Sequence, residues 1–296
     1  MTGNVTAGLN GTPESFAAVR WAAREAWLRQ LPLRIIHVRE WPLTPEVPVP
    51  PQQSEEDQAL LEKAARTAGL DRPGLEITTD NLSGDNPTRT LMAEVDAPGR
   101  VELLVLGSRG LNALAGFLVG STSLPVVAAS ERPVVLVRSE DPADAVDEGA
   151  APGSEELVLG VDLKETGADE GLLAFGFTEA ARRNSRLRVV HAWSLPAMYS
   201  YAQTADPGLG DELQGHITDT LERTVAPWRE RFPDVTVQAR AVVGTPGAEL
   251  VYASPGAGLL IVGRRRRRHP MGPRLGHVAH AVIHHAACPV AVVPHV

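Results

Sequence analysis

The chain has 296 residues, a length that suits two domains better than one. Its composition is that of a soluble globular protein, with 43% hydrophobic and 22% charged residues, and the low aromatic content of 4% predicts cores of Val, Leu, Ile and Ala. The formal charge of −8 argues against a nucleic-acid partner, and a single cysteine, Cys288, excludes an intrachain disulfide framework.

The first segments of the chain predict a strand followed by a helix. NVTAGLN, residues 4–10, is a short apolar run that ends in turn residues. Thr12 is the predicted N-cap of the helix, and Pro13 suits its first position. Residues at helical spacing predict its buried face: Phe16, Val19, Ala23, Ala26 and Trp27.

The same alternation continues through the first half. LRIIHV predicts a strand buried on both faces, and a Pro-rich loop then leads to a helix over about residues 55–68. The remaining elements are the strand LEITTDN, a helix containing TRTLMAEV, the buried strand VELLVLG, a helix over about residues 121–129 and the strand PVVLVR.

Four apolar segments of the first half recur in the second half in the same order. AGLNG corresponds to LGVDL, LRIIHV to LRVVHA, LLVLG to LLIVG, and PVVLV to PVAVV. Helices are expected around residues 172–183, 211–231 and 248–253, and before PVAVV. This duplication predicts two domains, residues 1–138 and 157–296, joined by an acidic linker at 139–156.

Strands that are separated by helices of this length pair in parallel. We therefore predict an α/β protein with two tandem doubly wound (Rossmann-like) parallel sheets, each of about five strands with helices on both faces. Ligands bind such sheets beyond the carboxyl ends of the strands, where the chain order reverses.

The glycine-rich stretch GSRGLNALAGFLVGST, residues 107–122, follows one of these strand ends. Glycines allow the backbone to approach a ligand closely, and the N–H groups of Ser121 and Thr122 at a helix start favour a phosphate, to which Arg109 would add charge. The alternative is a glycine-rich turn with Ser121 as an ordinary N-cap. The spacing matches neither a P-loop nor GxGxxG.

With this stretch, and with RPVVLVR after it and HHAACPVAVVP near the end, the chain resembles a tandem universal stress protein. The ATP-binding pattern of that family is G-x2-G-x9-G-[ST], which residues 107–121 match. The resemblance implies ATP with Mg²⁺ as the ligand. It implies these ATP-binding residues in the first half: Gly8, Asn10, Val38, Gly107, Ser108, Arg109, Gly110, Gly120, Ser121 and Thr122. Asn10 stands where the family often has Asp, so its bond to a ribose hydroxyl would lack the strength of a carboxylate.

The second half keeps only part of the pattern. Its corresponding residues are Gly160, Asp162, Ala192, Gly263, Arg266 and Gly276. Arg266 replaces Gly110, and His277 replaces Ser121. Three alternatives stay open: the run RRRRR at 264–268 holds a triphosphate, Arg266 fills an empty site, or the site takes another anion. The run can also be a solvated basic loop.

Other chemistry is not predicted. His280 and His284 have the spacing of a metal pair on a helix, but they also fit an ordinary last helix, and we predict no metal site. Cys288 predicts a buried thiol. No catalytic residue is predicted, because the sequence holds no GxSxG elbow and no nucleophile–base pair. The predicted function is an ATP-binding regulatory module of the stress response; the alternatives are a nucleotide-free structural or interaction protein and a weak ATP-hydrolysing enzyme.

The two apolar strands PVVLV and PVAVV predict sheet edges that invite pairing. The family pairs these strands, which implies an intramolecular pseudo-dimer of the two domains and leaves a homodimer open. We see no signal-peptide pattern and no apolar run near the roughly 18 residues of a membrane span, and we expect a cytoplasmic protein without a membrane partner.

Overall fold

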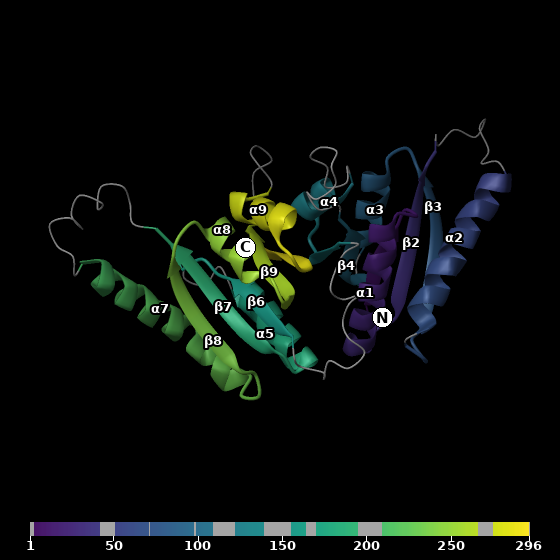
Figure 1. Ribbon diagram of the computed structural model, residues 1–296. Coiled ribbons are helices and arrows are strands. Elements are labelled where there is room, and N and C mark those ends of the chain that lie inside the picture. Colours follow the sequence, from purple (N-terminus) through teal and green to yellow (C-terminus); the bar gives the residue numbers. More distant parts are fainter. Residues whose placement is uncertain are drawn as a thin grey trace. The chain divides into compact units, whose positions relative to one another are not determined.

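The computed structural model of the chain describes residues 3–41, 51–70, 72–97, 99–108, 122–138, 155–163, 170–194, 209–265 and 275–295. The chain forms two compact units, Met1–Val146 and Asp147–Val296. In each unit, parallel strands form a sheet with helices on both faces, so the predicted doubly wound α/β fold is confirmed (Figure 1). Within the described ranges, none of the helices combines the length and the hydropathy that a membrane crossing requires.

The first unit has the strand order β3-β2-β1-β4-β5. Its strands are β1 (Asn4–Leu9), β2 (Leu33–Glu40), β3 (Ile77–Gly84), β4 (Val101–Gly107) and β5 (Val134–Val137). Its helices are α1 (Pro13–Arg29), α2 (Pro51–Leu70), α3 (Pro87–Val95) and α4 (Ser123–Ala129). Because parallel crossovers are right-handed, α1 and α2, which contact each other, cover one face, and α3 and α4 cover the other.

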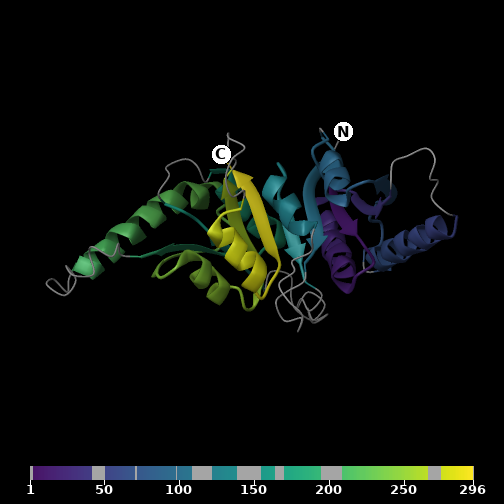
Figure 2. The ribbon, with the colours of Figure 1, turned by 90° about the horizontal axis from the view of Figure 1, so that it is seen from above.

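The second unit repeats this topology in the order β10-β9-β6-β7-β8. Its strands are β6 (Glu156–Gly160), β7 (Arg186–Trp193), β8 (Val237–Val243), β9 (Ala257–Arg265) and β10 (Val290–His295). Its helices are α5 (Glu170–Arg183), α7 (Leu209–Arg231), α8 (Pro246–Ala253) and α9 (His277–His285). Helix α5 packs with α7, and α8 packs with α9; Figure 2 shows α7 and α8 on opposite sides of the strands.

The topology fixes where a ligand site is expected. The chain order reverses between β1 and β4 in the first unit and between β6 and β9 in the second. The pairs Ala7–Val105 and Leu159–Ile261 mark these two switch points in the register. After the carboxyl ends of these two strands, the chain leaves toward opposite faces of the sheet. A crevice therefore lies between the two loops that follow the strands.

Helix α1 begins as predicted, but its buried face differs from the prediction. The Thr12 side chain accepts a hydrogen bond from the backbone N–H of Ser15 at 3.3 Å, and Pro13 opens the helix. Trp27, which was assigned to the buried face, is 53% exposed, whereas Trp21 is buried at 5%. Val19, Ala23 and Ala26 are buried as predicted. The assignment of Trp27 was wrong because alanines occupy so many positions of α1 that periodicity does not single out one face.

Several boundaries differ from the sequence-based expectation. Helix α2 begins at Pro51, about one turn earlier than expected, and β9 runs to Arg265, two residues beyond the expected end of the strand at Gly263. The longer β9 is paired to its last residue, since His295 of β10 lies opposite Arg265. In the first unit, the equivalent pairing of β4 with β5 stops at Gly107 and Val137.

Candidate functional site

A cavity of about 1230 Å³ lies at the carboxyl ends of the strands of the second unit. It is bordered by the ends of β6, β7, β9 and β10 and by the starts of α8 and α9. Five predicted residues of this unit line it: Gly160, Asp162, Ala192, Gly263 and Gly276. The sixth, Arg266, lies outside the described residues. Ligand sites in proteins typically measure about 300–1000 Å³, so this cavity is large enough for a small-molecule ligand.

Charged side chains of both signs face this cavity. Asp162 follows β6, and its Oδ2 lies 3.6 Å from Nη2 of Arg265 at the end of β9. Both side chains are about half exposed, so the pair contributes little to stability and stays accessible to a ligand. Asp162 is the carboxylate that the described residues contribute to the lining of this cavity.

His191 of β7 also lines the cavity, and its ring orientation is fixed by the backbone. Its Nδ1 donates to the carbonyl oxygen of Val161 at 3.0 Å, because a carbonyl can only accept. Within the described part of the chain, His191 makes no other hydrogen bond. A neutral His191 therefore keeps Nε2 as an acceptor, and a protonated one offers a second donor.

The duplicated histidine of the first unit has a different partner. Nδ1 of His37 donates to the carbonyl oxygen of Leu9 at 2.8 Å, as in the second unit, but its Nε2 lies 3.2 Å from Oδ1 of Asp57 in α2. Arg39 donates to Asp57 at 2.6 Å, and Asn81 donates at 3.1 Å. Burial alone would raise the pKa of Asp57, but these hydrogen bonds and the charges of His37 and Arg39 hold that pKa below its ordinary value.

In the second unit, neutral groups replace this charged network. Nε1 of Trp193, which corresponds to Arg39, donates to Oε1 of Gln214 at 3.0 Å, and Nε2 of Gln214 donates to the carbonyl oxygen of Ala241 at 2.8 Å. No carboxylate among these groups holds His191. The second histidine is therefore available to the cavity, whereas the first is engaged by Asp57.

Among the predicted residues of the first unit, Gly8 lies in β1 and Val38 in β2. Asn10 follows β1, and its Oδ1 accepts from the N–H of Thr12 at 3.2 Å and from the Thr12 hydroxyl at 2.7 Å. This oxygen therefore stabilises the turn into α1.

The structure describes the two ends of the glycine-rich stretch. Ser108 donates its backbone N–H to Val137 at 2.7 Å, and its buried hydroxyl has no hydrogen-bond partner among the described residues. The Ser123 hydroxyl, which the sequence analysis did not single out, donates to the carbonyl oxygen of Gly107 at 3.1 Å. The ends at Gly107 and Thr122 are thereby held at one edge of the sheet. The predicted residues between them, Arg109, Gly110, Gly120 and Ser121, lie outside the described residues.

Gly107 has a structural role besides its place in the pattern. A Cβ on this residue would lie 2.6 Å from the carbonyl carbon of Glu14 and 2.7 Å from the nitrogen of Ser15, both in the backbone of α1. At the equivalent Gly263, a Cβ would lie 2.5 Å from Nε2 of His295, at the end of a side chain that can rotate. The first glycine is therefore required by helix packing as well as by any ligand.

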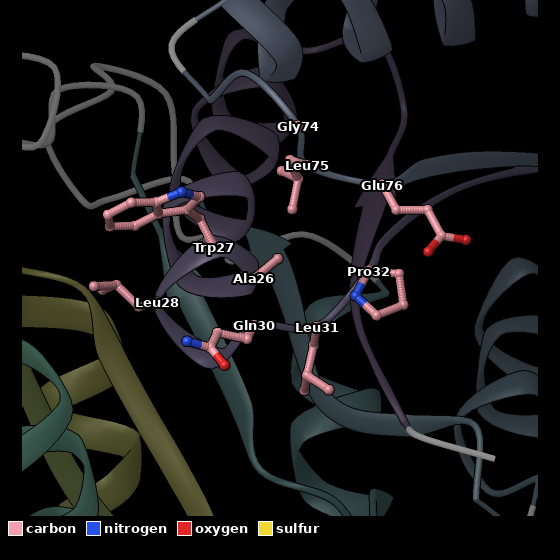
Figure 3. Close-up of a pocket in the computed structure, with 9 residues that line it drawn as sticks. All are labelled: Ala26, Trp27, Leu28, Gln30, Leu31, Pro32, Gly74, Leu75 and Glu76. Carbon is pink, nitrogen blue, oxygen red and sulfur yellow. The ribbon is translucent and has the colours of Figure 1, made fainter.

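A second pocket, of about 470 Å³, lies in the first unit (Figure 3). It is lined by Trp27 near the end of α1, by Leu31 after this helix, and by Leu75 and Glu76. These residues precede β2 and β3, so the pocket lies at the amino ends of the strands. It is therefore not the site that the topology predicts.

The histidines near the end of the chain lie close together without forming a metal centre in the described residues. The rings of His280 and His284 have centroids 4.4 Å apart. Across those same ranges, no group of three or more potential metal ligands is found. The predicted burial of the Cys288 thiol is confirmed.

Sequence reasoning missed the histidines of the cavity as a group. Besides His191, the cavity is lined by His277, His280, His285 and His295. The signal was available, since five of the nine histidines of the chain lie in its last 20 residues.

Comparisons with known proteins agree with the repeated architecture. The model of the Universal stress protein family matches residues 1–138 and 154–294. Universal stress protein Rv2005c of Mycobacterium tuberculosis is 34% identical over 299 residues, covering 97% of this chain and 96% of that protein. Universal stress protein Rv2623 of the same species is 32% identical over 299 residues, covering 97% and 95%. The crystal structure of a universal stress protein from Archaeoglobus fulgidus DSM 4304 has a TM-score of 0.68 at 16% identity over 98% of each chain, which supports the fold.

Proposed function

The chain belongs to the universal stress protein family in its tandem form, and on this premise we propose that it is an ATP-binding regulatory module of the stress response. The observation that carries the proposal is the cavity of the second unit. It lies at the switch point of a parallel sheet and gathers five of the six residues that the ATP pattern implies there. Asp162 would bind the ribose, and the backbone at Ala192 would meet the adenine edge.

The first unit is proposed as a second ATP site through the glycine-rich stretch that begins at Gly107. Mg²⁺ would enter with the phosphates of ATP. Among the described residues that line the cavity of the second unit, Asp162 is the one carboxylate, so that a Mg²⁺ ion would be held chiefly by phosphate oxygens.

Release and binding of nucleotide test the proposal. Purified protein, denatured and chromatographed, should release ATP, and ATP added to stripped protein should raise its Tm. Absence of both the released nucleotide and the Tm shift would overturn the proposal.

A matched pair of variants tests the location. Asp162→Asn should weaken ATP binding to the second unit about five- to tenfold, because a hydrogen bond to a charged group contributes roughly 1 kcal/mol more than a neutral one. Asp211→Asn, at the exposed start of α7, should bind as the unmodified protein does. Equal affinities of the two variants would overturn the assignment of the cavity.

We propose binding rather than turnover as the role of ATP, so that occupancy biases the conformation or the partner of the protein. Steady hydrolysis of many ATP molecules per chain, abolished in Gly110→Arg, would overturn this. Pairing of the two domains, a homodimer and a cytoplasmic location stay predictions.

A further inference from the structure

The cavity of the second unit is lined by five of the nine histidines of the chain. They come from three elements: His191 from β7, His277, His280 and His285 from α9, and His295 from β10. At the offset of 156 residues that relates the last elements of the two halves, the first half has Ser121, Leu124, Ala129 and Ser139 in place of the last four. Four of the five imidazoles are therefore a property of the second unit alone, and only His191 has a counterpart in the first unit, His37.

Among the described residues, the other ionisable groups in the lining are Asp162 after β6 and Arg264 and Arg265 of β9. Helix α8 contributes Pro246 and Leu250, and α5 contributes Leu172. The ionisable residues of these two helices, none of which lines the cavity, are Glu249, Tyr252, Glu170, Glu179, Arg182 and Arg183.

His284 completes the titratable groups on α9, with its ring centroid 4.4 Å from that of His280 and 6.4 Å from that of His285. Among the described residues of the lining, Asp162, Arg264 and Arg265 give a net charge of +1 when the imidazoles are neutral, and each imidazole that takes up a proton adds one positive charge. The overall formal charge of the chain is −8. Protonation therefore makes the lining of the cavity more cationic.

At the end of β9, Arg264 and Arg265 occupy the sequence positions that correspond to the start of the glycine-rich stretch in the first half. Because β9 and β10 pair as far as Arg265 and His295, two arginines belong to the strand instead of to a loop. The His295 ring lies against Gly263, within 2.5 Å of the position that a Cβ would take. Two arginine side chains, Arg264 and Arg265, therefore border this cavity at the strand end that in the first unit leads into the glycine-rich stretch.

From this geometry we propose that the histidines of the second unit bind a chain of phosphate groups, and that its affinity rises as the pH falls. The shared ligand chemistry is that of a nucleoside triphosphate or a free polyphosphate. If the ligand is ATP, the inference rests on the proposed function. If the ligand is a free polyphosphate, the inference does not depend on the proposed function.

The sign of the pH dependence follows from linkage. An imidazole gains its proton as the pH falls through about 6.5, and imidazolium forms charge-assisted hydrogen bonds with phosphate oxygens. At the first residue of α9, His277 meets the positive end of the helix dipole, which a bound anion offsets. Binding therefore takes up protons, and the bound phosphate favours the protonated rings.

The test compares the full chain with two variants, using ATP and inorganic triphosphate as probes in calorimetry at about pH 5.5 and about pH 8. His277→Gln/His295→Gln removes two cavity imidazoles, and His216→Gln, on the exposed surface of α7, is the matched control. The unmodified chain and the control should bind about tenfold more tightly at the lower pH, as one charge-assisted hydrogen bond implies. In the double variant, the affinities at the two pH values should be nearly equal.

Comparison at equal pH cancels the protonation of the probe itself, and titration in two buffers of different ionisation enthalpy should show net proton uptake. Should the double variant fail to fold, His280→Gln/His285→Gln changes two exposed positions of α9 and gives the same readout. If the ratio of the affinities at the two pH values were equal in the variant and the control, the inference would be overturned and the proposed function would stay intact. Binding of triphosphate but not of ATP would overturn the proposed function and leave the histidine site.

Discussion

Replacing Gly107 by alanine should destabilise the first unit much more than replacing Gly263 by alanine destabilises the second. The two glycines occupy the same place in the duplicated sheet: Gly107 ends β4, and Gly263 lies two residues before the end of β9. At Gly107 the new methyl group would meet the backbone of Glu14 and Ser15 at 2.6 and 2.7 Å. At Gly263 it would meet the ring of His295 at 2.5 Å, and that ring can rotate.

The magnitude follows from these contacts. Overpacking a close-packed site costs about 1–3 kcal/mol, and a backbone that cannot move aside places Gly107→Ala near the upper end. Replacing a glycine lowers the conformational entropy of the unfolded chain, which stabilises the folded state by about 0.4–1 kcal/mol. This contribution is the same in both variants and cancels in the comparison. We expect the free energy of unfolding to fall by about 2 kcal/mol more in Gly107→Ala than in Gly263→Ala.

Urea unfolding of the full chain measures the difference. With a slope of about 2 kcal/mol per molar urea, 2 kcal/mol moves the midpoint by about 1 M. Hydrogen exchange, followed by mass spectrometry of peptides from each unit, assigns the loss to one unit. Equal midpoints for the two variants, or a greater loss in Gly263→Ala, would refute the argument that the backbone of α1 makes Gly107 necessary.

Three further changes have definite expected outcomes. Thr12→Ala removes the N-cap of α1 and should lower the free energy of unfolding by about 1 kcal/mol, and an unchanged urea midpoint would contradict the cap. The lowered pKa of Asp57 means that its contribution to stability is present above the ordinary aspartate pKa of about 3.9 and is lost as the pH falls through the lower folded value. Asp57→Asn should therefore reduce stability at neutral pH, where Arg39 loses its partner, and flatten the acid limb of a Tm-against-pH curve; a parallel curve would count against the network. Ser254→Ala leaves the N–H of Ala287, now 2.8 Å from the Ser254 hydroxyl, without that acceptor and should cost about 1–3 kcal/mol in the same urea assay, whereas no change would show that another group replaces the hydroxyl.

Much of the fold could be predicted because its signals are local. The N-cap at Thr12, the proline at position 13 and the aliphatic runs of the strands act between neighbours in the chain. The duplication also survives in the sequence as repeated runs such as LRIIHV and LRVVHA. The face of α1 could not be predicted, since its alanines fit either side and only the packed sheet selects Trp21 over Trp27.

The candidate site divides in the same way. The glycine positions followed from their spacing together with the family resemblance, and Asp162 followed from that resemblance and the internal repeat. The structure brings the described members of the second set to one cavity. The histidines were not recognised as a group because His191 and His295 are far apart in the chain and meet the residues of α9 only through strand pairing.

The sequence by itself determined the succession of strands and helices, the two-fold repeat and the edge of the sheet at which a ligand is expected, because each depends on the order of residues along the chain. Tertiary structure decided which duplicated residues keep the same role. His37 is held by Asp57, whereas His191 faces a cavity; Gly107 supports a helix, whereas Gly263 lies under an imidazole. The reason is physical: a side chain acts on the groups that the sheet order and register place within a few ångströms, and those groups come from distant parts of the chain.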